Sequence, residues 1–304
     1  AIRKLPDTGD LPNEFVISMV DAHYFIHQGF ELCGGKLVKI GTQEKVTAGD
    51  YATGINERTA GVVFFLGSQS REQLPEIVAV AQEQQVPVIV DAAGQLPPAS
   101  NLTRFIAEGA DLVCFSGGKT IAGPQASGIL AGRKDLIEAA ALQHLDLDIL
   151  WDQWNPPEAL IDKSRLPGAP HHGIGRPCKV GKEEIVGLLT ALERFVAEGD
   201  DARQGRWLAH MQALVEAAGT IGGASVALRN DPKRKTIPAV HVQLDEDVLG
   251  KTALEVVREL QDGDPGIAAN PSYVREGVVA FGPMCLKEGE AEAVGRRLRA
   301  VLGA

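Results

Sequence analysis

Residues 111–132, DLVCFSGGKTIAGPQASGILAG, specify the fold that we predict for this chain. The apolar run at residues 112–115 indicates a buried strand, and residues 128–131 indicate a second one. Between them, two glycines allow the backbone to approach another group closely, and Lys119 follows them on the turn. An ammonium at the end of a core strand is costly unless it is paired or neutralised. We therefore expect Lys119 to form a Schiff base, which removes the charge.

A second apolar run, residues 86–90, lies upstream and ends in Asp91. Residues 102–108, between the two runs, have a helical pattern. A strand, a helix and a strand in this order form a right-handed crossover, which makes the strands parallel and places their carboxyl ends at one edge of the sheet. We therefore expect Asp91 and Lys119 to lie in one crevice, where open α/β sheets bind ligands.

A carboxylate and a lysine that converge there fit pyridoxal 5'-phosphate (PLP). The lysine binds the aldehyde, and the aspartate keeps the pyridine nitrogen protonated. A buried ion pair between Asp91 and Lys119 explains the same residues without a cofactor. Spacing alone leaves both interpretations open.

Three motifs in the chain resemble the selenocysteine synthase-like group of fold-type I PLP enzymes. They are DAAGQLPP at residues 91–98, FSGGK with the following GPQASGIL within residues 115–130, and HGIGRPCKVGKEEIVGLL at residues 172–189. The resemblance is strongest to the D-glucosaminate-6-phosphate ammonia-lyase branch and covers nearly the whole chain. It implies that Lys119 is the Schiff-base lysine, Asp91 the pyridinium partner and Ser116 a contact of the cofactor phosphate.

The resemblance also implies an α/β fold of the fold-type I class, with a mostly parallel doubly wound sheet and a smaller C-terminal α+β domain. We expect a large PLP-binding domain at residues 1–170, connecting helices at residues 171–219 and the small domain at residues 220–304. The family has a further segment before residue 1, with a Gly/Ala-rich turn that helps to hold the PLP phosphate. Without that segment, a protein that binds only PLP or a partner is the non-enzymatic alternative.

The predicted activity is α,β-elimination on an amino acid or amino-sugar acid such as D-glucosaminate 6-phosphate, with release of ammonia and a 2-keto acid. A selenocysteine synthase-like transferase, a racemase or an aldolase would use the same lysine chemistry. We expect a homodimer or higher homo-oligomer, because fold-type I sites commonly form at a dimer interface and residues 147–170 form a long apolar loop.

Two further residues are candidate cofactor ligands. His23 follows the strand predicted at residues 14–19, at the position where related enzymes stack an aromatic ring on PLP. His27, one helical turn later, is the competing candidate, and a surface or core histidine is the alternative for either. Gln95 is a candidate hydrogen-bond donor to the phenolic oxygen of PLP, although related enzymes have this glutamine one position earlier.

Residues 171–182 combine glycines with Arg176, Lys179 and Lys182, which is typical of an anion site for the cofactor phosphate or a phosphorylated substrate. Arg176 is the main candidate, and an ordinary turn before a helix is the alternative. We expect no metal site here, because adjacent histidines do not readily face one ion. Arg275 is a candidate ligand for the substrate carboxylate, and a surface arginine is its alternative.

Composition limits the remaining possibilities. The net charge of −10 argues against a nucleic-acid partner, including the tRNA that a selenocysteine synthase binds. There is no apolar run of about 18 residues and no signal-like start, so we expect a cytoplasmic protein with no membrane partner. The cysteines lack CxxC spacing, as expected of reduced thiols.

Overall fold

The computed structural model describes residues 4–145, 148–170, 172–231 and 236–303. Leu147 and His171, which belong to the predicted loop and the predicted anion site, lie outside the described residues. The chain divides into two compact units. Unit 1 comprises Ala1–Leu96 and Ser100–Phe195, and unit 2 comprises Pro97–Ala99 and Val196–Ala304.

Unit 1 contains a sheet whose six described strands follow the order β2-β1-β3-β4-β5-β6. The strands are β1 (Glu14–Ser18), β2 (Lys36–Ile40), β3 (Thr59–Phe65), β4 (Val88–Asp91), β5 (Leu112–Ser116) and β6 (Gly128–Gly132). All neighbours from β2 to β5 pair in parallel, and only β6 is antiparallel, at the edge. The mostly parallel sheet is therefore confirmed.

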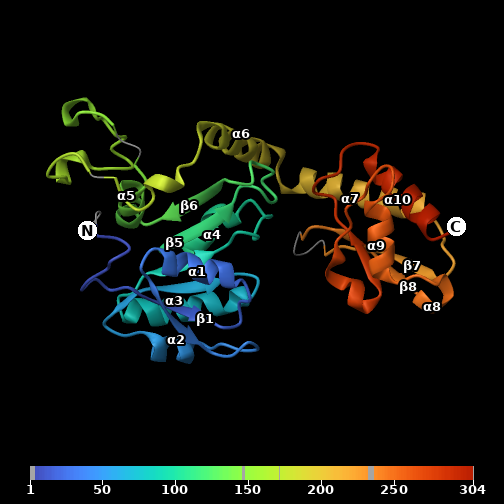
Figure 1. The fold of residues 1–304 in the computed structure, drawn as a ribbon, viewed down its shortest axis with the longest axis horizontal. Coiled ribbons are helices and arrows are strands. Elements are labelled where there is room, and N and C mark those ends of the chain that lie inside the picture. Colours follow the sequence, from blue (N-terminus) through green and yellow to red (C-terminus); the bar gives the residue numbers. More distant parts are fainter. Residues whose placement is uncertain (1–3, 146–147, 171, 232–235, 304) are drawn as a thin grey trace. The chain divides into compact units, whose positions relative to one another are not determined.

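Unit 1 has helices on both sides of this sheet, and α6 (Lys182–Glu198) lies beyond the sheet (Figure 1). The others are α1 (Tyr24–Leu32), α2 (Ala48–Gly54), α3 (Leu74–Glu83), α4 (Asn101–Ala107) and α5 (Lys134–Gln143). Ile17 of β1 packs with residues of α1, whereas a Cβ on Gly54 of α2 would lie 3.0 Å from Val16. Because consecutive strand residues point to opposite faces, α1 and α2 lie on opposite sides of the sheet, as a doubly wound fold requires.

The strand order places a topological switch point between β1 and β3. The chain passes from β1 to β2 in one direction and then returns past β1 to β3. The loops after β1 and β3 therefore diverge at the carboxyl edge and leave a crevice, where doubly wound proteins bind their ligands. The loops that follow β4 and β5 continue along the same edge.

Within residues 148–170, the described part of the predicted loop, the only helical segments are the 3-10 turns η2 (Trp151–Gln153) and η3 (Lys163–Arg165). Lys163 Nζ donates hydrogen bonds to the carbonyls of Trp151 (2.8 Å) and Trp154 (2.6 Å) and lies 4.6 Å from the centre of the Trp151 ring. The loop thus has a folded centre of its own, while Leu150 is exposed. Its role at a site or an interface stays a prediction.

Unit 2 is a small α+β unit. A three-stranded antiparallel sheet of β7 (Ala224–Arg229), β8 (Ala239–Leu244) and β9 (Val278–Phe281) shares one core with its helices. The helices are α7 (Asp200–Ala218), α8 (Glu246–Leu249), α9 (Ala253–Gln261) and α10 (Glu290–Val301). Unit 2 also contains the 3-10 turn η5 (Pro271–Glu276), and unit 1 contains the 3-10 turn η4 (Arg176–Cys178). The sequence did not indicate α8, a single turn capped by Asp245, whose Oδ1 accepts from Val248 N.

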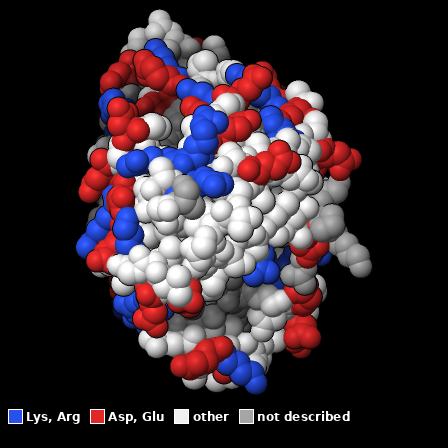
Figure 2. Space-filling view, turned by 90° about the vertical axis from the view of Figure 1, so that its right-hand side faces the viewer, with Lys and Arg blue, Asp and Glu red and all other residues white. Residues whose placement is uncertain are grey.

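The division into units assigns α6 to unit 1 up to Phe195 and α7 to unit 2, whereas the sequence suggested one connecting segment at residues 171–219. The domain limits stay predictions. None of the helices in the described ranges has the length and apolar character needed to cross a membrane. Figure 2 shows one side of the molecule, on which basic and acidic side chains are interspersed around an uncharged area rather than forming a continuous basic surface.

Candidate active site

Asp91 and Lys119 are brought together by the loops that follow β4 and β5. Asp91 is in register with Cys114 of β5, so the two strands end side by side. The Nζ atom of Lys119 lies 3.8 Å from the place that a Cβ would occupy on Gly94, three residues after Asp91. The next residue, Thr120, donates its hydroxyl to the carbonyl of Leu96 at 2.8 Å. The amine of Lys119 therefore lies over the loop that begins at Asp91.

The two side chains do not form the ion pair that was the alternative interpretation. Among the described residues no ion pair joins Asp91 to Lys119, and the Asp91 carboxylate accepts a hydrogen bond from Ala93 N at 2.9 Å. Lys119 is exposed and Asp91 is partly buried. The premise that the Lys119 amine is buried is thus wrong for this chain, because the turn projects beyond the end of β5 at Ser116.

Asp91 has a neutral neighbour across the strand pair. Burial and, to a smaller extent, the negative charge of Asp91 raise the pKa of the Cys114 thiol to about 11. Cys114 therefore stays protonated near neutral pH and adds no second negative charge beside Asp91. A carboxylate in this position is available to a positively charged partner such as a pyridinium nitrogen.

The glycines of the FSGGK motif allow the loop to fold tightly behind Lys119. A Cβ on Gly117 would clash with Ser127 Oγ and would lie 2.8 Å from Leu188 of α6. Gly123 N donates to Gly117 O at 2.8 Å, and Ala122 between them adopts a φ of +59°, in the left-handed region that few L residues enter. Backbone strain of this kind concentrates at functional sites, since packing must hold it.

His23 and its neighbours lie at the switch point between β1 and β3. His23 Nδ1 is 2.7 Å from Asp21 Oδ1, and Ser68, after β3, donates its hydroxyl to the same oxygen at 2.7 Å. Asp21 is 1% exposed, whereas the His23 side chain is 60% exposed. Burial opposes ionisation of Asp21, but the hydrogen bonds from His23 and Ser68 outweigh it and hold the pKa of this carboxyl below its ordinary value.

His27, the competing candidate, lies in the core. It is almost fully buried, and its ring stacks on Phe65 of β3 with centroids 5.6 Å apart. Its Nε2 atom lies 3.3 Å from Asp21 Oδ2 without the geometry of a hydrogen bond. Of the two histidines, only His23 has an exposed face on which a planar ring can stack. The stacking itself stays a prediction.

Gln95 contacts the end of β3. Its Nε2 atom donates to the carbonyl of Leu66 at 3.1 Å, and its backbone carbonyl accepts from Asn101 at 2.7 Å. The first bond ties the loop after β4 to the end of β3, and the second ties the same loop to α4. The predicted bond to a phenolic oxygen requires the Gln95 amide to bond a cofactor as well as Leu66, and it stays a prediction.

The predicted phosphate contacts come from two places in unit 1. Ser116 ends β5 and pairs with Gly128 of β6. Gly128 lines a cavity of about 370 Å³ together with Lys179 and His144. Arg176, which begins η4, is partly buried in the preceding turn. The cavity brings one positive side chain of the predicted anion site close to the partner of Ser116.

The predicted substrate ligand Arg275 belongs to unit 2. It lies on η5 and lines an open groove with Asp245, Glu246, Asp247 and Glu276. The side chain is exposed and its neighbours are acidic, so an isolated substrate carboxylate would meet both signs of charge in this groove. Its predicted role is not tested by these contacts.

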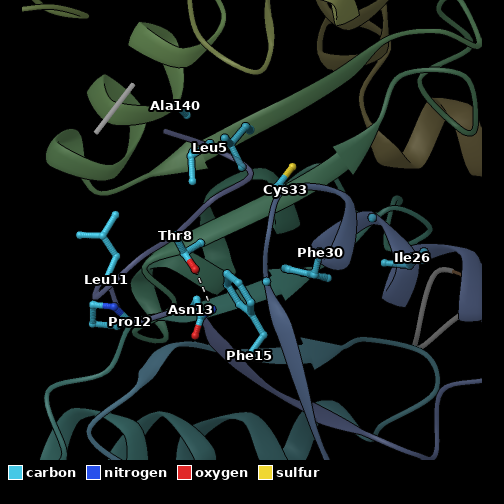
Figure 3. Close-up of a pocket in the computed structure, with 13 residues that line it drawn as sticks. Leu5, Thr8, Leu11, Pro12, Asn13, Phe15, Ile26, Phe30, Cys33 and Ala140 are labelled. Carbon is cyan, nitrogen blue, oxygen red and sulfur yellow. Dashed lines mark hydrogen bonds between the residues drawn. The ribbon is translucent and has the colours of Figure 1, made fainter. Parts of the chain in front are cut away.

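A third cavity, with a mostly apolar lining, lies away from these residues. It has a volume of about 730 Å³ and lies between residues 5–13, α1, β6 and α5 (Figure 3). Phe15 and Phe30 form one wall, with ring centroids 4.8 Å apart, and none of the predicted site residues lines it. In the part of the chain that the structure describes, no three His, Cys, Asp or Glu side chains are grouped as metal ligands.

Sequence reasoning missed Asp21 and Thr120. Asp21 stands two residues before His23, and the sequence analysis considered this stretch only for stacking of the His23 ring on PLP. The available signal was a carboxylate three residues after the apolar strand β1, because a carboxylate so close to the core needs hydrogen-bond donors nearby. Thr120 had no signal in the sequence, because its hydroxyl bonds the carbonyl of Leu96 in a different loop.

Comparisons with known proteins agree with this architecture. The profile of the family described as SelA, L-seryl-tRNA selenium transferase, matches residues 23–150. A 5'-C-glycyluridine monooxygenase-decarboxylase from Streptomyces sp is 31% identical over 310 residues, which cover 99% of this chain and 70% of the relative. D-glucosaminate-6-phosphate ammonia lyase from Salmonella typhimurium is 29% identical over 307 residues, which cover 98% of this chain and 73% of the relative.

A solved structure extends the comparison to the fold. The structure of D-glucosaminate-6-phosphate ammonia-lyase matches with a TM-score of 0.71 and 27% identity, covering 98% of this chain and 73% of that one. The doubly wound sheet and the small α+β unit therefore define a fold-type I protein, as predicted. The chain belongs to the selenocysteine synthase-like family, together with these relatives, and the resemblance stated from the sequence is confirmed.

Proposed function

We propose that this protein is a PLP-dependent carbon–nitrogen lyase. It performs α,β-elimination on an amino-sugar acid such as D-glucosaminate 6-phosphate and yields a 2-keto acid and ammonia. The observation that carries the proposal is the position of the Lys119 amine over the loop that begins at Asp91. The ammonia-lyase relative, which aligns with 98% of the chain, supports the choice of reaction and substrate class.

The residues at this edge fit the cofactor. The Lys119 amine is exposed and available to bind an aldehyde, and the Asp91 carboxylate has no ion-pair partner among the described residues. Asp91 would hold the proton on the pyridine nitrogen, and His23 would stack on the ring. When bound, PLP supplies an electron sink for the carbanion at the substrate Cα.

Lys119 has a second role in the proposal. With PLP and substrate bound, the Lys119 amine would be the base that removes the proton from the substrate Cα. The β-hydroxyl then leaves as water, and hydrolysis of the resulting enamine consumes one water. The net reaction converts a 2-amino-3-hydroxy acid to a 2-keto acid and ammonia without any oxidant or reductant.

Ser116 and Arg176 are the proposed ligands of the cofactor phosphate, with Gln95 at the phenolic oxygen. Arg176 and Arg275 are proposed for the anionic groups of the substrate, because a guanidinium pairs bidentately with carboxylate or phosphate. Substitution of Ser116 or Gln95 should lower the affinity for PLP, and substitution of Arg275 should raise the KM for the substrate. Substitution of Arg176 should do both.

Incubation with PLP and D-glucosaminate 6-phosphate tests the reaction through release of ammonia and formation of keto acid. Serine and threonine serve as smaller substrates with the same 2-amino-3-hydroxy pattern. Equal amounts of ammonia and keto acid support elimination. A racemised or cleaved substrate, in place of these products, identifies a racemase or an aldolase, and no turnover of any of the three contradicts the proposal.

The monooxygenase-decarboxylase relative favours a second candidate, an oxidative decarboxylase. It is 31% identical over 99% of the chain. This activity consumes dioxygen and releases carbon dioxide, whereas elimination does neither. The same incubation in an oxygen electrode therefore separates the two candidates. Transfer to a seryl-tRNA, the third candidate, requires a tRNA, which we do not expect an acidic chain to bind.

We also propose that the protein is a cytoplasmic homodimer, and we predict that it sediments as a dimer at micromolar concentration. The apolar side chains of Ile185, Val186 and Leu189 on α6 are exposed, which favours an interface. A Leu189→Glu variant is expected to weaken dimerisation about tenfold or more, because it places a charge in an apolar contact. Thr190→Glu on the same helix is the matched control. A monomeric wild type contradicts the prediction.

A further inference from the structure

Asp21 is the centre of a hydrogen-bond network at the switch point. Its Oδ2 atom accepts from the backbone N–H of His23 at 3.0 Å. Its Oδ1 atom contacts His23 Nδ1 and accepts from Ser68 Oγ, each at 2.7 Å. The carboxylate thus joins the loop after β1 to the loop after β3, the two loops that diverge at the crevice.

The contact with Nδ1 determines the form of the His23 ring. Asp21 is held as a carboxylate by its donors, and a carboxylate only accepts hydrogen bonds. The proton of the neutral ring therefore resides on Nδ1, and Nε2 remains an unprotonated acceptor. A carboxylate in contact with one imidazole nitrogen fixes both the tautomer and the ring orientation, as it does for histidines that bind metals or act in catalytic triads.

The network is packed against the core through His27. The Nε2 atom of His27 lies 3.3 Å from Asp21 Oδ2, and its ring is stacked on Phe65. The rings of Phe25 and His23 contact each other in a T-shaped arrangement, with centroids 5.7 Å apart. The buried carboxylate, whose side chain is 1% exposed, is thus enclosed by its partners, whereas the His23 side chain is 60% exposed and is anchored through Nδ1.

We infer that Asp21 is a positioning residue, which orients the His23 ring as a platform for the cofactor and keeps its Nε2 atom free to accept a proton or hydrogen bond. The inference rests on the proposed function for the place of the cofactor. A platform that is ordered before binding loses less conformational entropy when a planar ring stacks on it. Removal of Asp21 should then weaken PLP binding although Asp21 does not touch PLP.

The first test uses the protein without cofactor. Histidine side-chain ¹⁵N NMR, assigned with His23→Phe, reports which ring nitrogen carries the proton. We expect His23 to be the Nδ1–H tautomer in the wild type and to shift towards the Nε2–H tautomer in Asp21→Asn. Ser68→Ala, which removes another donor from the same oxygen, is the matched control and should leave the tautomer unchanged. An unchanged tautomer in Asp21→Asn overturns the inference.

The second test measures PLP affinity. Asp21→Asn should raise the Kd for PLP about tenfold, the effect of one lost hydrogen bond to a charged group. In the His23→Phe background, which keeps a planar ring, Asp21→Asn should have no further effect. An equal loss in both backgrounds shows a merely structural role and overturns the inference. If the wild type binds no PLP, the proposed function fails, whereas the tautomer experiment still decides the role of Asp21 towards His23.

Discussion

A Lys119→Ala variant is expected to carry no pyridoxyl group in its 117–120 turn after incubation with PLP and reduction with borohydride. The wild type is expected to carry one group there, on Lys119. The Lys119 amine is exposed and lies 3.8 Å from the Cβ position of Gly94, at the loop that begins at Asp91. In the proposed function this amine attaches the cofactor, and Asp91 would bond the ring nitrogen. Peptide mapping by mass spectrometry measures the labelling.

The same substitution should lower the rate of ammonia release by about 10⁴-fold or more, because it removes both the attachment of the cofactor and the base at the substrate Cα. Lys134→Ala, an exposed lysine on α5, is the matched control and should keep both the Lys119 label and the rate. Free PLP also reacts with surface lysines, so substoichiometric PLP is used. Labelling spread over many lysines, with none preferred, would contradict the assignment of Lys119.

An unlabelled wild type has a different meaning. It would show that the residues of this chain do not hold PLP, and it would favour the non-enzymatic alternative, a protein that binds a partner. The tautomer of His23 and the oligomeric state can be measured in either case. The cofactor and the reaction are therefore tested separately.

The fold follows from the sequence because short-range signals agree with one another. Apolar runs at residues 86–90 and 112–115 became β4 and β5, and the pattern at residues 102–108 became α4, each within two residues. A crossover of this length has one favoured hand, so the parallel pairing and the common edge for Asp91 and Lys119 follow without any knowledge of the rest of the chain.

The site was harder to predict, because its geometry depends on contacts between loops. The sequence indicated a lysine and an aspartate at one edge but suggested that the lysine is buried, since periodicity does not show how far a turn projects beyond its strand. It also identified His23 as a candidate but not Asp21, whose three donors come from two separate loops. Residues 171–182 show the same limit, because charge and glycine content do not reveal which cavity a lysine lines.

Asp91→Asn is expected to separate cofactor binding from catalysis. An amide has nearly the shape of a carboxylate, so the bond from Ala93 N and the fold of the loop should be retained. It cannot balance the charge of a pyridinium, and the ring nitrogen then loses its proton. The electron sink is weaker in that state, so the rate of product release should fall roughly 10²–10³-fold, the range typical of one lost electrostatic contact to a reacting group. Lys119 should still be labelled, because its amine does not depend on Asp91 for its position.

Asp111→Asn provides the matched control. Asp111 precedes β5 at the opposite edge of the same sheet, where its carboxylate accepts from Val88 N at 2.8 Å and pairs with Arg133 at 2.8 Å. Its substitution should lower the thermal stability and leave the rate of the folded enzyme unchanged. The absorption spectrum of bound PLP checks the protonation of the ring nitrogen in Asp91→Asn. An Asp91→Asn variant with full activity would contradict the role of Asp91 as the partner of the ring nitrogen. Residues 92–100 contain no other carboxylate that could replace it.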